Sequence, residues 1–502
     1  MPAVESRQKS VPNNAEPNPP AWISLEIQQN INEPIRSRIS YAFRIFAAIY
    51  NYKVCDPDPS SKALRCFYTE TPPASPDPSI FYIPARYLGG RVSSKNDPLT
   101  VHSYANENVY LWHGVDPSTG NPDWLGEIFV WLSCGHEVIS TKRDSVGRVP
   151  YSETAFAEFE ITPRKPYAAI LMAWMENALR NGNTVEALAK APCPIKNADH
   201  IVLPSHDIDY TYTTKSSAAV RLFKNLVIAC RMYRNASFFC DNLLMLLKLI
   251  RGDRIGDYLP ALIQKMEAMG FRSTFFAVAR HGHRRDPDYR LDEIAASLND
   301  VNRKGFSVNL HGSYKSIVED SSLRIEAEAL ELAVGKYPTG SRQHWLRFGS
   351  QDSLFRETER AAFHFDSSIG FPEKVGFRSG ASFPYPPYDF EKEAPFSFLE
   401  FPLVLMDGGL EAECRGSGEN PQAVADKILH ESRTWGWGGI SIVWHNPIDP
   451  IQVPDKINQV FWNCAKKRTE FQEEWMSTDQ FLPVCLHRFQ NAGLLKGISL
   501  DA

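Results

Sequence analysis

A short segment places acidic and imidazole side chains where a buried strand would reach solvent. The apolar residues 201–203 lead into Ser-His-Asp-Ile-Asp at 205–209. Asp207 and Asp209 point the same way on an extended chain, because they are two residues apart. Two close carboxylates repel each other, and the repulsion is relieved if one binds a metal ion and the other acts as a base. A plain acidic turn capping a helix is the alternative, and only downstream residues can decide.

Further polar residues recur at the ends of later predicted strands. They are His311 after 306–310, Arg347 within 345–348, Asp407 after 398–406 and His445 after 440–444. In barrels of parallel strands the chemistry lies at the carboxyl ends of the strands. A lone His or Arg at such a place is usually structural, but recurrence after successive strands predicts one shared cleft.

The order of predicted elements defines three regions. Residues 1–20 are rich in Pro, Asn, Ser and Glu, which is typical of a disordered tail. Residues 21–195 are expected to form a smaller α+β domain, and the Pro-containing polar stretch 192–199 marks its end. From 196 to 500, apolar strands alternate with helices, which predicts an α/β fold with a parallel sheet wrapped by helices. A region of about 300 residues favours a closed or nearly closed β/α barrel.

Composition narrows the classes of partner. The 502 residues are 43% hydrophobic and 23% charged, with a formal net charge of -5. This net charge gives no reason to expect nucleic acid or an anionic membrane as a partner. Nine cysteines without a C-x-x-C pair indicate reduced thiols in a cytoplasmic protein. No apolar run is long enough to suggest a transmembrane segment.

Six motifs together resemble the polysaccharide deacetylase family (NodB homology, carbohydrate esterase family 4), over residues 197 to 490. They are SHDID at 205–209, STFF at 273–276, LHGSY at 310–314, WLRF at 345–348, GFRSG at 376–380 and IVWHN at 442–446. The chain is most similar to a branch associated with surface polysaccharides, which carries an uncharacterised N-terminal domain. The resemblance implies a distorted (β/α)7 barrel and a divalent metal, commonly zinc. It also implies removal of acetyl groups from amino sugars or polysaccharides.

The resemblance assigns catalytic roles residue by residue. Asp207 matches the base and Asp209 the metal carboxylate, although the intervening Ile208 leaves these two roles reversible. His311 matches the first metal histidine. Arg347 matches the arginine that pairs with the base. His445 matches the acid that protonates the leaving group, and its ordinary pKa near about 6.5 suits that role.

Other residues have two interpretations each. Asp407 could orient His445 by accepting its second N–H, or it could be a turn aspartate. Arg378 could replace Arg347 beside the base, or bind substrate. Tyr385 and Tyr388, in a Pro-rich stretch, could form an aromatic rim for a sugar ring, or a plain loop.

The sequence departs from the family at the metal site. The second metal histidine usually lies four residues after the first, and Lys315 stands there. Zinc prefers three protein ligands plus water. A lysine ammonium would be repelled by a cation, so Lys315 should point away. The third ligand is then His206, His344, Ser313, Ser316 or water, and a weak oxygen donor would favour Mn or Mg over zinc.

Two functions from different classes remain. The first is a metal-dependent carbohydrate N-deacetylase that hydrolyses a non-peptide C–N amide bond. The second is a catalytically inactive barrel that binds saccharide or scaffolds polysaccharide biosynthesis, which the replacement by Lys315 favours. A phosphoesterase is disfavoured, because the sequence has no basic cluster or Gly-rich phosphate cradle.

Overall fold

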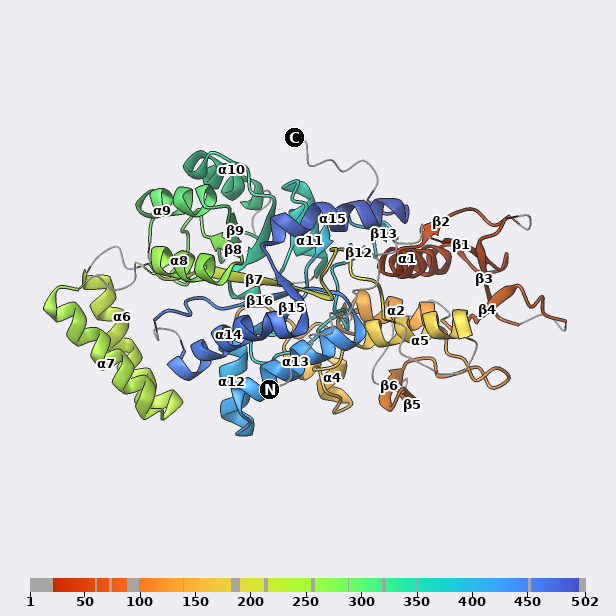
Figure 1. Ribbon diagram of the computed structural model, residues 1–502, viewed down its shortest axis with the longest axis horizontal. Coiled ribbons are helices and arrows are strands. Elements are labelled where there is room, and N and C mark those ends of the chain that lie inside the picture. The colour runs from red at the N-terminus through yellow and green to blue at the C-terminus, as the bar shows by residue number, and fades with distance from the viewer. Residues whose placement is uncertain are drawn as a thin grey trace, which may run out of the picture.

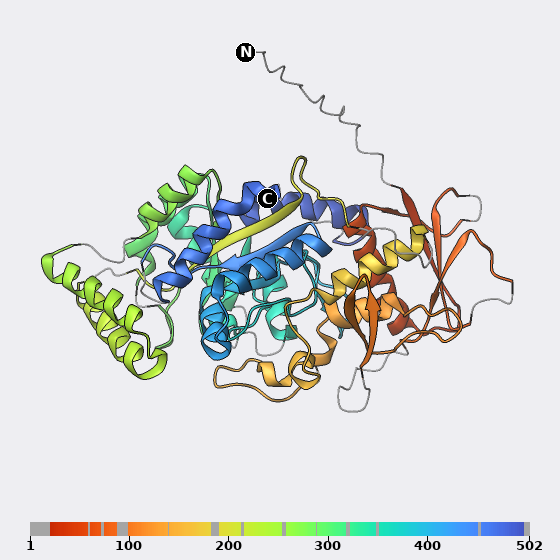
Figure 2. The same cartoon turned by 60° about the horizontal axis from the view of Figure 1, so that its bottom comes forward.

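The computed structural model is elongated, with the barrel-like part between two extensions (Figure 1). It describes residues 21–58, 61–71, 75–87, 99–138, 140–181, 190–211, 215–253, 258–287, 289–317, 322–347, 351–449 and 453–495. The predicted disordered tail, 1–20, lies outside these residues. The N-terminal region occupies one end and a helical hairpin the other (Figures 1 and 2).

A parallel sheet organises the second part of the chain. Within the described residues it has nine strands, in the order β14-β11-β10-β9-β8-β7-β16-β15, with β17 also beside β7. The strands are β7 (His200–Ile208), β8 (Thr274–Ala277), β9 (Ser307–Gly312), β10 (Gly340–Gln343), β11 (Phe365–Asp366), β14 (Leu399–Glu400), β15 (Leu403–Met406), β16 (Gly438–Val443) and β17 (Glu473–Trp475).

The two end strands of this sheet follow each other directly in the chain. The Phe401 N–H donates to the Asp366 carbonyl at 2.9 Å, and the Ser441 N–H donates to the Pro402 carbonyl at 2.8 Å. One extended stretch therefore pairs with β11 and then with β16, so the sheet curls round on itself. The α/β class with a parallel sheet is confirmed, the sheet is curled, and the (β/α)7 barrel stays a prediction.

Amphipathic helices cover the outside of the sheet. They are α8 (Leu259–Met269), α9 (Leu291–Arg303), α10 (Ser322–Val334), α11 (Gln351–Arg360), α12 (Asp407–Ser417), α13 (Pro421–Trp435), α14 (Asp455–Lys467) and α15 (Thr478–Asn491). Helix α8 ends at Gly270, whose φ of 77° is the left-handed conformation that glycine adopts readily. A π-helical turn at Ala229–Tyr233 separates α6 (Lys215–Ile228) from α7 (Ala236–Arg251).

The predicted strand at 345–348 is wrong. The strand of that unit is β10, which ends at Gln343, and His344–Leu346 form a 3-10 turn. Trp345 and Leu346 have φ values of 65° and 47°, which an extended strand cannot contain. The apolar pair that suggested a strand instead carries the chain over the carboxyl end of the sheet.

The N-terminal region has its own small sheet, of parallel strands in the order β2-β1-β3-β4. Its elements are β1 (Trp22–Ile27), α1 (Glu33–Tyr50), β2 (Lys53–Val54), β3 (Leu64–Thr69), β4 (Ile80–Pro84), β5 (Thr100–Tyr104), β6 (Glu107–Leu111), α2 (Trp124–Leu132), α3 (Gly135–Val138), α4 (Ala155–Glu158) and α5 (Tyr167–Asn181). Helix α1 buries a wide apolar face, and Asn32 caps its first turn.

One hydrophobic core runs through both parts of the chain. Trp131 and Tyr167 of the first part belong to the same buried cluster as Trp437 and Phe481 of the second. The Arg38 side chain also reaches across to Glu393. The two parts are therefore packed together without a solvent layer, and the boundary expected near 195 stays a prediction.

Candidate functional site

Asp207 and Asp209 lie at the carboxyl end of β7. All nine residues of β7 are buried, because the strand pairs with β8, β16 and β17. Asp207 is the next-to-last residue of β7, and the Asp209 N–H donates to the Asp207 carbonyl at 3.0 Å. Their side chains are 5% and 13% exposed, so both carboxylates lie at the floor of the site.

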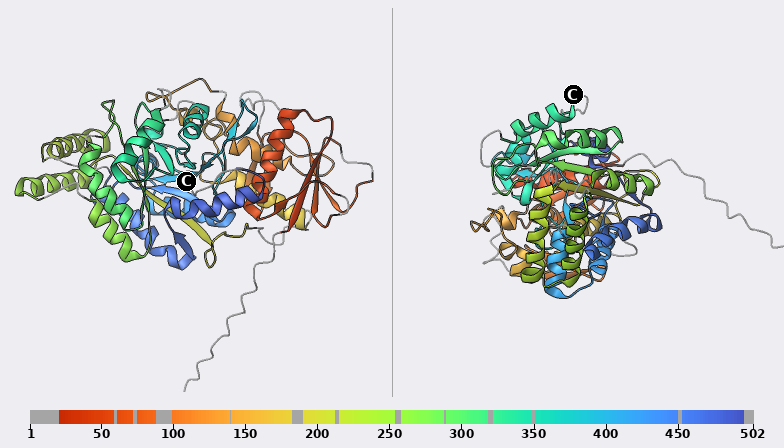
Figure 3. Two further views of the ribbon diagram at one scale, coloured as in Figure 1. Left: turned by 90° about the horizontal axis from the view of Figure 1, so that it is seen from above. Right: turned by 90° about the vertical axis from the view of Figure 1, so that its left-hand side faces the viewer.

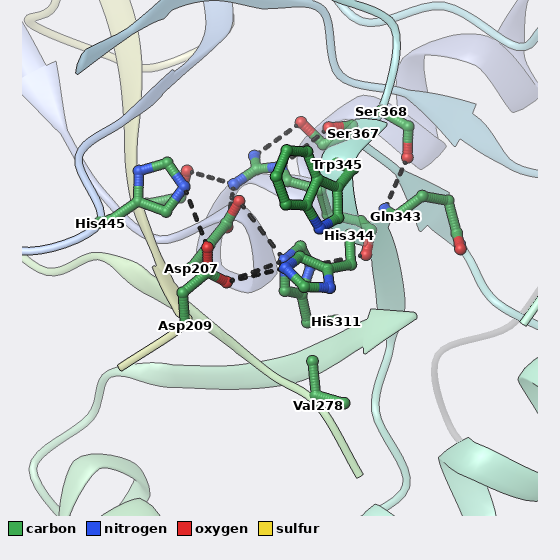
Figure 4. A network of polar contacts seen from close by, with 12 residues as sticks. Asp207, Asp209, Val278, His311, Gln343, His344, Trp345, Ser367, Ser368 and His445 are labelled. Carbon is green, nitrogen blue, oxygen red and sulfur yellow. Dashed lines mark hydrogen bonds and ion pairs between the residues drawn. The ribbon is translucent and has the colours of Figure 1, made fainter. Parts of the chain in front are cut away.

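Asp209, His311 and His344 form a group that can hold a metal ion. The Asp209 Oδ1 atom lies 3.5 Å from His311 Nε2 and 3.6 Å from His344 Nε2. One ligand atom from each residue lies within 4.8 Å of the others. Figure 4 shows both imidazoles directed at Asp209. One carboxylate and two histidines are a donor set that zinc accepts.

Two features of this group fit a bound cation. Asp209 Oδ1 is buried and has no hydrogen-bond partner, a costly state that an ion would relieve. His311 Nδ1 lies 2.9 Å from the Arg342 carbonyl, so that nitrogen carries the proton. His311 Nε2 is then left with a lone pair facing Asp209.

His344 occupies the place that the replacement by Lys315 had left open. It belongs to the 3-10 turn after β10, whereas Lys315 is exposed, as expected. The Nδ1 atom of His344 lies 3.8 Å from Asp286 Oδ1. The Asp286 carboxylate is itself fixed by backbone N–H groups, including those of His283 at 2.8 Å and Tyr314 at 2.7 Å. Burial opposes the charged imidazole, but Asp209 and Asp286 raise the pKa of His344 to about 9.

The arginine beside Asp207 is Arg342, and the expectation for Arg347 is corrected. Arg342 Nη1 donates to Asp207 Oδ1 at 2.8 Å from a side chain with no exposed surface. Burial raises the pKa of Asp207, yet Arg342 together with His311 leaves it below its usual value. Arg347 instead donates to the carbonyls of Val146 and Tyr314.

Sequence reasoning missed Arg342 because the strand was placed five residues too late. Within β10, Arg342 Nε donates to the Ser367 carbonyl at 2.9 Å and Nη2 donates to Ser441 Oγ at 2.7 Å. The guanidinium also lies 4.2 Å from the Phe276 ring centre. In the sequence, Arg342 is a lone arginine in the segment Gly-Ser-Arg-Gln, which is typical of an exposed turn. Only the neighbouring strands show that this segment is a buried strand.

His445 and Asp407 form the second polar pair of the site. His445 Nδ1 lies 2.8 Å from Asp407 Oδ1, and the His445 N–H donates to Asp407 Oδ2 at 3.0 Å. Asp407 also accepts from the Gly408 N–H at the start of α12, so the orienting and turn interpretations both apply. His445 Nε2 points toward Asp209 Oδ2, 3.7 Å away. Although burial lowers it, Asp407, Asp209 and Asp207 raise the pKa of His445 to about 10.

Four other predicted residues, which include His206 and Arg378, lie away from this cluster. His206 packs its ring against Phe275, and its Nδ1 lies 2.6 Å from the Trp444 carbonyl, so it does not face Asp209. Arg378 is buried and donates to Glu137 of the N-terminal region. The four residues are His206, Arg378, Tyr385 and Tyr388.

The two tyrosines are core residues. Tyr385 is 2% exposed and its N–H donates to the Glu400 carbonyl at 3.1 Å. Tyr388 is 3% exposed and its ring meets Tyr41 of α1 at 5.0 Å between centres. The Pro-rich stretch is therefore part of the packing against the N-terminal region and provides no sugar-binding rim.

Comparison with known proteins finds no matching family model and no matching curated protein. Three solved structures are similar to part of this chain. The polysaccharide deacetylase Bc1974 from Bacillus cereus is 11% identical, with a TM-score of 0.29, covering 55% of this chain and 91% of that one. The peptidoglycan deacetylase PdaC from Bacillus subtilis is 11% identical, with a TM-score of 0.28, covering 59% and 95%. A mutant of BA3943, a CE4 family pseudoenzyme with restored enzymatic activity, is 10% identical, with a TM-score of 0.30, covering 60% and 72%.

Proposed function

We propose that this protein is a metal-dependent hydrolase that removes an acetyl group from an amino sugar or polysaccharide. Likenesses this distant carry no functional argument, so the proposal rests on the site. The observation that carries it is the arrangement around Asp209: a cation-binding Asp/His/His group lies between two oriented proton-transfer pairs, Asp207–Arg342 and His445–Asp407.

The geometry supports different tasks for the two aspartates. Asp209 faces both imidazoles and acts as the metal carboxylate. When bound there, a divalent ion such as zinc, Mn or Mg would polarise the amide carbonyl and acidify a water molecule. Asp207 has Oδ1 engaged by Arg342, while Oδ2 lies 3.9 Å from His311 Nε2 on the cation side. Asp207 Oδ2 is therefore the oxygen that accepts the proton of the attacking water.

His445 supplies the second proton transfer. Its Nδ1–H is held by Asp407, so a protonated Nε2 is directed into the site. Asp407 stabilises the charged imidazole, which keeps a proton available at neutral pH. His445 Nε2 then donates this proton to the departing sugar nitrogen, and an amine leaves in place of an unstable amide anion.

Acetate release tests this proposal. The full chain, loaded with zinc, Mn or Mg, is incubated with N-acetylated oligosaccharides of several sugars, and the loss of acetyl groups is read by mass spectrometry. We expect release with the wild type and a loss of at least about a hundredfold in Asp207→Asn and His445→Gln, since each removes a general acid or base. Arg303→Gln, on the distant helix α9, is the matched control and should keep full activity.

The inactive-barrel alternative predicts a different pattern. An inactive barrel would bind saccharide without releasing acetate under any of the three metals. If the wild type binds N-acetylated oligosaccharide in calorimetry and never cleaves it, the catalytic proposal is refuted.

A further inference from the structure

The α6–α7 hairpin projects from the barrel-like part at the end opposite the N-terminal region (Figures 1 and 3). The helices pack against each other through a small apolar cluster that includes Leu222 and Met245. The Asn225 amide donates to Asn242 Oδ1 at 2.7 Å inside this interface. The hairpin therefore has its own minimal core, and its remaining faces are available for other contacts.

One face of the hairpin is apolar and exposed. Its members are between 38% and 74% exposed: Val220, Phe223, Val227, Leu243, Leu247 and Ile250. Within each helix they recur at spacings of three, four or seven residues, which gives one stripe per helix. Helix α10, by contrast, exposes only Ile325 at 44% and Leu332 at 90% among its large apolar side chains, which is common on surfaces.

The two stripes lie on the same side of the hairpin. Phe223 follows the buried Leu222, and Leu243 follows the buried Asn242. Phe223 and Leu243 are therefore each turned by about 100° in the same sense from a residue of the interface between the helices. Because the helices run antiparallel, equal turns in the same sense bring Phe223 and Leu243 to one side of the hairpin. The other exposed apolar residues of each stripe lie further round the helix, on the outer flank of that side.

The opposite edge of the hairpin faces the rest of the molecule, and it is polar. The Arg221 guanidinium lies 4.1 Å from the ring centre of Tyr210, just after β7. Burial and the nearby charge of Asp455, at the start of α14, raise the pKa of Asp241. The polar edge thus rests near the barrel-like part and the apolar face is directed away from it. This is the reverse of an ordinary surface helix, which buries its apolar face.

Positive charge borders the apolar face. Residues 215–253 contain seven Lys or Arg and two Asp, a net charge of +5 in a chain whose net charge is -5. Basic residues lie four positions after exposed apolar ones, and so beside them on the helix surface. The pairs are Val220 with Lys224, Val227 with Arg231 and Leu247 with Arg251. The negative net charge of the whole chain does not reveal this local excess of positive charge.

We propose that the apolar face of the α6–α7 hairpin docks on an anionic lipid surface. An exposed apolar face bordered by Lys and Arg is typical of segments that lie in a membrane interface, where apolar burial and attraction to acidic headgroups act together. None of the helices in the described part of the chain is long and apolar enough to cross a bilayer, so the contact is with its surface. Pairing two copies through this face would bring their basic borders together, and like-charge repulsion disfavours it.

Docking would also hold the edge of the sheet that carries Asp207 and Asp209 near the lipid surface. The hairpin follows β7, whose end carries Asp207 and Asp209, and Arg221 contacts Tyr210 next to them. The inference itself does not depend on the proposed function. The Asp209→Asn variant should bind lipid as the wild type does, so a failed acetate assay and a failed lipid assay are distinguishable.

Vesicle flotation with the full chain tests the inference. The probes are vesicles of phosphatidylcholine alone and of phosphatidylcholine mixed with phosphatidylglycerol. We expect binding only to the mixed vesicles, weakened by added salt. The double variant Phe223→Ser and Leu247→Ser should lower the partition coefficient at least about tenfold, because the buried apolar area is lost. Replacing Lys224 or Arg251 by Gln should lower it about fivefold for each charge removed.

Controls and contrary outcomes are specific. Leu332→Ser on α10 and Arg303→Gln on α9 match the two chemical changes elsewhere on the surface and should leave binding unchanged. Equal binding to both vesicle types, no flotation of the wild type, or hairpin variants that float like the controls would each overturn the proposal. So would a wild-type dimer in sedimentation velocity that Phe223→Ser and Leu247→Ser convert to a monomer, because the face would then be an interface between copies.

Discussion

Replacing Arg342 is the sharpest way to test the electrostatic design of the site. Arg342 is completely buried and forms a 2.8 Å ion pair with the buried Asp207. Arg342→Gln leaves a buried carboxylate without its cation, which costs about 3–5 kcal/mol of unfolding free energy. Arg347→Gln is the matched control, because Arg347 is partly exposed and donates to the carbonyls of Val146 and Tyr314. It should cost about 1–3 kcal/mol.

The pH dependence of the loss in unfolding free energy shows whether the unpaired Asp207 carboxylate causes it. In the wild type the pKa of Asp207 lies below its ordinary value, so its charged form stabilises the fold above about pH 4 and that contribution is lost as the pH falls through the folded pKa. In Arg342→Gln, burial is no longer opposed by Arg342, and the pKa of Asp207 should rise above its unfolded value. The variant is then destabilised at neutral pH and recovers relative to the wild type as the pH falls toward about 4.

Urea unfolding from neutral pH toward about pH 4 measures both quantities. The gap between Arg342→Gln and the wild type should narrow on acidification, while the gap for Arg347→Gln should stay constant. A constant gap for Arg342→Gln, or a cost no larger than that of Arg347→Gln, would refute the assigned pairing.

The remaining predictions concern the metal site, the acid and the N-terminal region. His344→Ala should lose zinc during dialysis, measured by mass spectrometry, whereas the exposed Lys315→Ala should retain it; equal retention would exclude His344 as a ligand. Asp407→Asn should lower the pKa of His445 from about 10, followed by NMR. Since a raised histidine pKa stabilises the fold at low pH and that stability is lost as the pH rises through about 10, the alkaline loss of stability should begin earlier in this variant; an unchanged profile counts against the pair. A chain starting at residue 196 should aggregate, because it exposes the shared core; a soluble truncated chain with native near-UV circular dichroism would show that the second part folds alone.

The sequence predicts most of the sheet because its strands are apolar and bounded by turn residues. The pair Asp207 and Asp209, with His311 and His445, could be placed in one cleft because each follows an apolar strand. Arg342 could not be found, since whether an arginine inside a strand faces a carboxylate depends on the neighbouring strands. The structure instead places it between Ser441 and Asp207, which lie on two other strands.

Side chains chosen by motif alone were the least predictable part. Arg378, Tyr385 and Tyr388 lie in a segment that packs on the N-terminal region, and this contact joins parts of the chain hundreds of residues apart. His344 was one of several candidates for the third ligand. Its selection depends on where β10 ends, because the 3-10 turn that follows places His344 Nε2 3.6 Å from Asp209 Oδ1, and no residue pattern in the sequence marks that end.

The central claim is that Asp209, His311 and His344 together bind a divalent ion. Anomalous X-ray diffraction from crystals of the full chain soaked in zinc tests it most directly. The account predicts one strong zinc peak, about 2.0–2.2 Å from an Asp209 oxygen and from Nε2 of both His311 and His344. A peak coordinated by other residues, or no peak at this site in crystals that bind zinc elsewhere, would contradict it.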